Sequence, residues 1–267
     1  MRSGGDVVVA TRRRRWPGAP PNRALEATVK TDSPSSAVQR IADGRTDLVC
    51  DLPAGEGSDD ETLTTALRWA AYYGDVTAVR VLVSRGVPLH ALGENLGLNA
   101  AAFHGRWQLC EYLLEQGADP NHALPTTGET PLHAALTKAN RPNVDLVVEL
   151  LLDCHADPNA PTVPGAPTDC FMRDCRTVGE TPLHRAAAYG SEGCVVRLLD
   201  ASADRAARDA NGDTPLAWAS WHLRPDAILK RLCYGRHTIR ADRDSTYDHG
   251  LGWEVMGRGR PHGAASR

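Results

Sequence analysis

Gly179-Glu-Thr-Pro-Leu-His-Arg-Ala-Ala-Ala-Tyr-Gly190 is the stretch of this 267-residue chain that recurs most clearly. A later copy, Gly212-Asp-Thr-Pro-Leu-Ala-Trp-Ala-Ser220, places its threonine 33 residues further on, and Gly128-Glu-Thr-Pro-Leu-His-Ala-Ala135 begins an earlier one. Two looser copies, Thr65–Gly74 and Leu96–Gly105, lie nearer the N-terminus, 31 residues apart. Self-similarity at this period predicts a stack of repeated supersecondary units.

Each copy carries the signals of two consecutive helices. A threonine hydroxyl can cap the first helix, and the proline after it fits the first helical position, where a missing N–H costs nothing. A glycine then ends that helix, and we expect a left-handed backbone there. The capping threonines are Thr130, Thr181 and Thr214, and the glycines are Gly74, Gly105 and Gly190.

The second helix of each copy follows as an apolar stretch with helical spacing. Leu109-Cys-Glu-Tyr-Leu-Leu-Glu-Gln-Gly117 is an example, and it continues into Ala-Asp-Pro-Asn121. Gly86 and Gly117 are expected to end these second helices in the same left-handed way.

The strings Thr-Pro-Leu-His-x-Ala-Ala and Gly-Ala-Asp-Pro-Asn resemble those of the ankyrin repeat, over residues 65–235. The resemblance implies an all-α ankyrin-repeat solenoid with hairpin-like tips. It also implies a protein-interaction scaffold that binds a partner protein through the concave face of the first helices and the tips. In that family the histidine of the string ties turns together by hydrogen bonds, which is the role it implies for His133 and His184.

The organisation predicted from these copies has three parts. A basic leader, disordered by composition, precedes an ankyrin domain, and a Gly- and Arg-rich tail follows it, partly folded back or disordered. The boundaries are 1–35 for the leader, 36–62 for a degenerate N-terminal cap, 63–93, 94–127, 128–178 and 179–211 for repeats, 212–235 for a C-terminal cap, and 236–267 for the tail.

An insert lengthens the third repeat. Thr130 and Thr181 are 51 residues apart, 18 more than the 33-residue period, and the excess falls at 161–178. Three prolines and a glycine in its first half predict an extended loop or finger. A shorter spacer, at 137–145, lengthens the turn between the two helices of that repeat.

Candidate partner-binding residues lie at the two positions before the end of each first helix and at the tips. Outward aromatic rings are costly to leave in water, and Tyr and Trp are frequent interface anchors. Core packing is the alternative for Tyr72, Phe103 and Trp221, whereas exposure is favoured for Tyr73, His104, Tyr189 and His222. The full set adds Lys138 and the tip residues Asn95, Asn211 and Asp213. Thr137 and Ala188 occupy the equivalent helix-end positions of their repeats, and Glu94 and Thr127 are further tip residues.

Composition and charge argue against nucleic-acid binding by the array and against a membrane-spanning segment. Residues 1–30 carry seven basic and two acidic side chains, so their net charge is +5 and that of the remainder is −8. An acidic body argues against nucleic-acid binding by the array, although Arg12–Arg15 could bind phosphate weakly. No apolar run is long enough to span a bilayer, and Pro17, Pro20 and Pro21 would break a targeting helix. We expect a cytoplasmic monomer.

Two rival functions remain open. Cys170 and Cys175, with Cys154 and His155 upstream, could form a metal or redox site, but free thiols are the simpler interpretation of seven scattered cysteines. Residues 228–240 resemble the start of a SOCS box, which would make the chain a substrate adaptor of a ubiquitin ligase. No phosphate loop, nucleophile elbow or His-Glu zinc motif is found, so we expect no enzyme, no catalytic residue, no cofactor, no bound metal and no small-molecule substrate.

Overall fold

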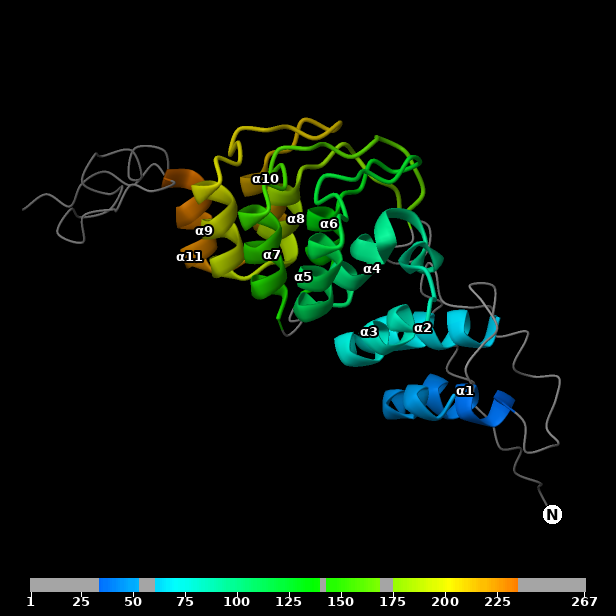
Figure 1. The fold of residues 1–267 in the computed structure, drawn as a ribbon. Helices are drawn as coiled ribbons and strands as arrows, with labels where there is room; N and C mark the ends of the chain where they lie inside the picture. Colours follow the sequence, from blue (N-terminus) through cyan, green and yellow to red (C-terminus); the bar gives the residue numbers. More distant parts are fainter. Residues whose placement is uncertain (1–33, 53–60, 140–142, 169–174, 235–267) are drawn as a thin grey trace, which may run out of the picture.

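The computed structural model describes residues 34–52, 61–139, 143–168 and 175–234. Within them the chain forms helices and no β-sheet, which confirms the predicted all-α class (Figure 1). The α-helices are α1 (Pro34–Ala42), α2 (Glu61–Tyr73), α3 (Val76–Ser84), α4 (Leu98–Phe103), α5 (Trp107–Glu115), α6 (Pro131–Ala135), α7 (Val144–Asp153), α8 (Pro182–Tyr189), α9 (Glu192–Asp200), α10 (Pro215–Trp221) and α11 (Asp226–Tyr234). Short 3-10 helices are η2 (Thr46–Asp51), η3 (Leu89–Leu92) and η4 (Glu94–Gly97).

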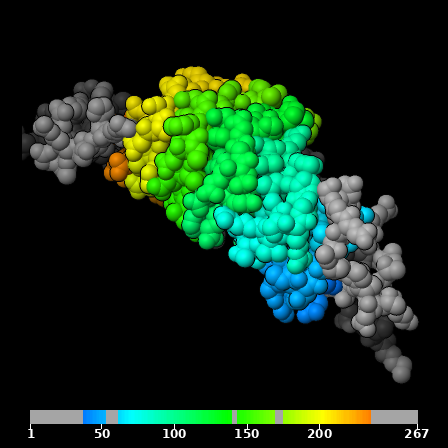
Figure 2. Space-filling model, viewed as in Figure 1, coloured from blue at the N-terminus to red at the C-terminus, as the bar shows by residue number. Residues whose placement is uncertain are grey.

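From α2 onward the helices form antiparallel pairs that succeed one another along an elongated body. Figure 2 shows the colours running in sequence order along that body, so each pair contacts chiefly its neighbours in the chain. The long loops that join α5 to α6, α7 to α8 and α9 to α10 gather along one edge (Figure 1). This is the geometry of a solenoid, in which no single pair buries its apolar face alone.

The predicted threonine caps begin three of the first helices. The Thr214 hydroxyl accepts a hydrogen bond from the Ala217 N–H at 3.3 Å. Thr130 and Thr181 use a variant of this cap, because the Nδ1 atom of the histidine three residues on accepts from the threonine N–H, at 3.2 Å for His133. The cap predictions are therefore confirmed.

The predicted left-handed glycines hold at four helix ends and fail at one. Gly74 and Gly105 have φ of 76° and 67°, and Gly86 and Gly117 have 91° and 94°. Gly190 is different, with an extended backbone at φ −72° and ψ 168°, so that prediction is wrong. Glycine is still needed there, since an added Cβ would lie 2.8 Å from the Ala186 carbonyl oxygen.

A hydrogen bond from each first helix to the loop of the next repeat links the array. His133 Nε2 lies 3.1 Å from the Glu180 carbonyl oxygen, and His184 Nε2 lies 3.1 Å from that of Asp213. The looser copies lack the histidine but make the same kind of bond: Arg68 Nε donates to the Ala91 oxygen at 3.0 Å, and Asn99 Nδ2 donates to the Glu129 oxygen at 3.1 Å. The tying role implied for the histidines is thus present, and two other side chains share it.

Asparagines form a second set of links, at the tips. The Asn121 amide donates to the His155 carbonyl oxygen at 2.9 Å and accepts from the Asp157 N–H. Asn159 bridges Ser202 and Asp204 of the following repeat in the same way. These paired bonds hold each tip in register with the next one.

Two elements lie at the N-terminal end, α1 and the 3-10 helix η2, where the sequence predicted a degenerate cap. The Tyr73 hydroxyl donates to the Ala42 carbonyl oxygen at 2.7 Å, and the Arg85 guanidinium donates to the carbonyl oxygens of Val49 and Leu52. Residues 53–60 of the predicted cap lie outside the described residues.

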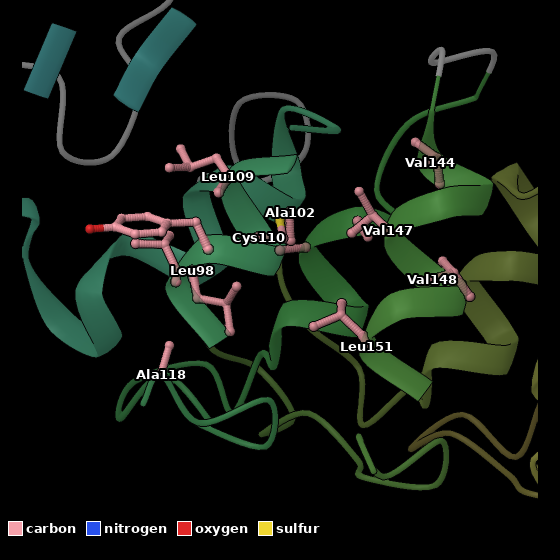
Figure 3. Packing of buried hydrophobic residues seen from close by; sticks show 14 of the residues in the cluster. Leu98, Ala102, Leu109, Cys110, Ala118, Val144, Val147, Val148 and Leu151 are labelled. Atoms are coloured by element: carbon pink, nitrogen blue, oxygen red, sulfur yellow. The ribbon is translucent and has the colours of Figure 1, made fainter. Parts of the chain in front are cut away.

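The core runs the length of the stack between the two layers of helices. Figure 3 shows one section of this core, with Leu98 and Ala102 of α4, Cys110 of α5, and Val147 and Leu151 of α7. All five side chains are essentially inaccessible to water. Small and branched side chains fill this space at the close helix spacing that the repeat imposes.

Candidate protein-binding groove

A buried ion network marks the junction between the third and fourth helix pairs. The Arg185 side chain of α8 is fully buried. Its Nη2 atom lies 2.6 Å from Glu129 Oε1 and 2.6 Å from Glu180 Oε1, and Nη1 donates to the His133 carbonyl oxygen at 3.0 Å. Both glutamates precede a capping threonine, so the repeat itself places the two carboxylates around the one cation.

The charge states follow from this geometry. Burial would raise the pKa of the Glu180 carboxyl, but Arg185, the Thr162 hydroxyl and the Val178 N–H outweigh it and hold that pKa below its ordinary value. Burial, followed by the nearby Arg185 cation, lowers the pKa of His133 to about 3. The glutamate is therefore ionised and the imidazole neutral near pH 7.

The first arm of the insert, residues 162–168, lies directly on this network. The Thr162 hydroxyl donates to Glu180 Oε2 at 2.7 Å, and the Thr168 hydroxyl donates to the Glu129 carboxylate at 2.9 Å. Both threonines are buried. The first arm is thus anchored at both of its ends by buried hydrogen bonds to two different repeats.

The arms pair with one another as a short antiparallel ladder. Pro167 and Arg176 are opposite residues, the Thr168 N–H donates to the Cys175 oxygen at 3.1 Å, and the Thr177 N–H donates to the Ala166 oxygen at 2.9 Å. The insert's tip, 169–174, lies outside the described residues. The second arm continues into the loop before α8, where the Ala210 N–H donates to the Val178 oxygen at 2.7 Å.

A groove of about 380 Å³ opens between this second arm and the C-terminal first helices. One wall is the insert arm, the floor is the tip that precedes α10, and the other wall is formed by rings from α8 and α10. Its lining residues are Cys175, Arg176, Val178, Glu180, Tyr189, Asp209, Asn211, Asp213, Trp218, Trp221 and His222.

Aromatic rings dominate the helical wall. The Tyr189 ring lies edge-on to the His222 imidazole, with centroids 4.9 Å apart. Trp218 is held by its indole N–H, which donates to Asp209 Oδ2 at 3.0 Å. Trp221 is 79% exposed, an unusual amount for the largest apolar side chain. Burial raises the pKa of Tyr189, and burial with the Arg224 cation lowers the pKa of His222, so both rings are neutral at pH 7.

Comparison with known proteins agrees with the repeat pattern. Models of ankyrin repeats match residues 98–147 (many copies) and 147–242 (three copies), which together make up more than half of the chain. The chain belongs to the ankyrin-repeat family.

Similar ankyrin proteins are far larger than this chain. It is 31% identical over 165 residues to palmitoyltransferase AKR1 of Lachancea kluyveri, covering 61% of this chain and 20% of that protein. It is 29% identical over 155 residues to target of rapamycin complex 2 subunit AVO2 of Saccharomyces cerevisiae, covering 56% and 32%. Human neurogenic locus notch homolog protein 2 is 34% identical over 164 residues, 60% of this chain and 6% of that protein. Shared ankyrin repeats indicate a protein-interaction module.

The structure brings five predicted ankyrin-surface residues together in the groove: Tyr189, Asn211, Asp213, Trp221 and His222. Elsewhere, the two predicted positions before the end of each first helix are only partly accessible to solvent. In the third and fourth repeats the first of these positions is buried, as Thr137 and Ala188, and the tip residue Thr127 is buried as well, so their assignment to the exposed surface is wrong. Lys138 is exposed but lies outside the groove lining.

The N-terminal candidates form a separate cluster. The Tyr72 ring lies edge-on to the His104 imidazole at 5.2 Å, and Phe103 lies edge-on to the same imidazole at 5.1 Å. Tyr72, Tyr73, Phe103 and His104 are all half-buried, so rings pack on rings between α2 and α4. Asn95 is occupied by the Asp119 backbone, since its amide donates to the Asp119 oxygen at 2.8 Å and accepts from the Asp119 N–H at 2.7 Å.

Arg185 and the insert arm are parts of this site that the sequence did not predict. The glutamates before Thr130 and Thr181 were a usable signal, because two recurring acidic positions beside buried caps require a buried partner. The arm's role had no such signal, since its contacts depend on how a proline-rich loop folds back.

The described parts of the chain contain no arrangement of side chains that supports the rival metal site. There, no three His, Cys, Asp or Glu side chains gather closely enough to share an ion. Cys170, half of the suggested cysteine pair, lies outside those parts. Residues 228–234 of the SOCS-like stretch belong to α11, the second helix of the last repeat, and residues 235–240 lie outside the described parts. Among the described residues, no helix is both long and apolar enough to cross a bilayer.

Proposed function

We propose that this chain is a non-enzymatic ankyrin scaffold and that it binds a partner protein in the groove between the insert arm and α8 and α10. The observation that carries the proposal is the exposed Trp221 ring at a concave, largely aromatic wall. Such rings are the usual high-energy contacts of protein interfaces, and the surrounding groups can exclude water once a partner is seated.

Rigidity supports the same proposal. Trp218 is fixed by Asp209, and Tyr189 rests against His222. The insert arm that lines the groove is paired with the first arm, which is anchored through Thr162. A surface whose side chains are already ordered loses little conformational entropy on binding. The remaining predicted candidates, Tyr72, Tyr73, Phe103, His104, Lys138 and Asn95, would at most extend the contact surface toward the N-terminal repeats.

Site-specific photo-crosslinking tests the assignment. A benzophenone side chain placed at Trp221 in the intact chain should capture a defined protein from a cell extract, and Tyr189→Ala in the same chain should reduce that capture at least fivefold. Leu146 provides the matched control position, since it is an exposed apolar side chain, 44% accessible, on α7. Equal capture of the same proteins from positions 221 and 146 would contradict the proposal.

A further inference from the structure

We infer that the groove accepts an extended segment of its partner and that this segment places an arginine or lysine side chain between the aromatic wall and Asp213. This inference rests on the proposed function and specifies the chemistry of the partner.

The insert arm offers the backbone groups of one residue, Arg176, to a ligand; two residues on, the Val178 N–H and oxygen are already bonded to Glu180 and Ala210. In the ladder of the insert, the Thr177 N–H and the Cys175 oxygen face the other arm. Neighbouring residues of a strand direct their backbone groups to opposite sides, so those of Arg176 face away from the other arm. Within the described residues, the Arg176 N–H and carbonyl oxygen have no hydrogen-bond partner. An extended peptide is the ligand that pairs with such an edge.

One acidic side chain of the groove is uncompensated. Asp209 accepts from the Trp218 indole and from the N–H groups of Asn211 and Asp213, and Glu180 is paired with Arg185. The Asp213 carboxylate has no hydrogen-bond or ion-pair partner among the residues described. It is half-buried, where a charge is less well hydrated and gains more from an opposite charge than it would in open water.

The aromatic rings that line the same groove suit the same ligand. Trp221 and Tyr189 are neutral aromatic groups, and the face of such a ring attracts an ammonium or guanidinium ion. The stem of a lysine or arginine would lie along the rings while its charged end reaches Asp213. A carboxylate with aromatic neighbours therefore favours a basic side chain over an apolar one of equal length.

Arg176 limits how many basic residues the segment can carry. This exposed side chain lines the opposite wall, where its Nη1 atom donates to the Gly165 oxygen at 2.6 Å. A second cation next to it would be repelled. The fitting segment has one basic residue flanked by uncharged or acidic ones.

Immobilised peptide pools test the inference with the intact chain. Four pools of 11-residue peptides, random except for a central Arg, Lys, Glu or norleucine, would be compared for retention of the purified protein. We expect the Arg and Lys pools to retain at least fivefold more protein than the norleucine pool, and Asp213→Asn to remove most of that difference. Asp153→Asn, at an exposed aspartate of α7, is the matched control and should leave the preference unchanged.

Two outcomes would overturn the inference. Equal retention by the Arg and norleucine pools, still lost in Trp221→Ala, would exclude the basic occupant while leaving the groove as the binding site. Unchanged retention of an Arg pool whose flanking amides are N-methylated would exclude pairing with the Arg176 edge. If the photo-crosslinking side chain at position 221 captured no protein at all, the result would instead count against the proposed function.

Discussion

At the scale of single residues, one bond is made by three kinds of side chain. Arg68, Asn99, His133 and His184 occupy the same position of successive repeats, and each bonds to a carbonyl oxygen of the next loop. The requirement at this position is therefore a buried or partly buried donor of suitable reach, and imidazole is one way to meet it. Histidine differs from the others in that it can take up a proton.

This difference predicts how stability depends on pH. The pKa of buried His133 is about 3, against an ordinary value near 6.5, so between these values the unfolded chain binds a proton that the folded chain does not. The free energy of unfolding should then fall as the pH is lowered from about 6.5 toward 3. His133→Asn, which introduces the side chain that Asn99 uses in its own repeat, should keep the bond to Glu180 and flatten this dependence.

Denaturant titrations at pH 7, 6, 5 and 4 measure the effect. His90→Asn is the control, because this exposed histidine is not part of the set. A fall between pH 7 and 4 that is equally steep in His133→Asn and in the unaltered protein would contradict the assignment to His133.

The sequence predicted the residues whose role is local and missed those whose role is distant. A threonine followed by a proline indicates a helix cap within two residues, so Thr130 and Thr181 could be assigned. Arg185 could not, because charged side chains are almost never fully buried unless paired. One of its carboxylates, Glu129, is 56 residues away, and only the stacking of two repeats brings it within reach.

At the scale of the element, the ends of the second helices differ between repeats. Gly86 and Gly117 take the left-handed conformation at the first two, whereas His155 and Ser202 hold it at the third and fourth, with φ of 65° and 70°. A side chain makes that conformation costly, by about 1–2 kcal/mol for L-residues. The period of the repeat predicted where each second helix ends. The residue at that position determines how much conformational free energy the left-handed backbone costs.

Replacing the two strained residues should therefore stabilise the array. We expect His155→Gly and Ser202→Gly each to raise the free energy of unfolding by about 1 kcal/mol, because the left-handed strain is relieved while the backbone bonds to Asn121 and Asn159 remain. Equilibrium unfolding in urea gives the values. Gly117→Ala is the reverse control, since an added Cβ there meets nothing within 4 Å and its cost reports the backbone alone. A loss of stability in both glycine variants would refute this interpretation.

At the scale of the whole molecule, the regular stack explains the array, and one irregular segment explains the groove. The predicted binding column assumed that every repeat presents the same face to solvent. That holds where Tyr189, Trp221 and His222 meet the insert arm, and it fails where Thr137 is buried. The excess of 18 residues revealed that an insert exists, but its fold depends on contacts with Glu129 and Glu180, which only the assembled repeats provide.

The insert should consequently stabilise the array, unlike an ordinary surface loop, whose length has little effect. Thr168→Val keeps the shape of the side chain but removes the hydroxyl that donates to both oxygens of Glu129, which leaves that buried carboxylate short of a hydrogen bond. We expect a loss of about 1–3 kcal/mol in the free energy of unfolding. Thr126→Val, at an exposed threonine of a neighbouring loop, should change stability little. If Thr168→Val matched this control, the insert would rest on the array without supporting it, and the rigidity inferred for that wall of the groove would lose its support.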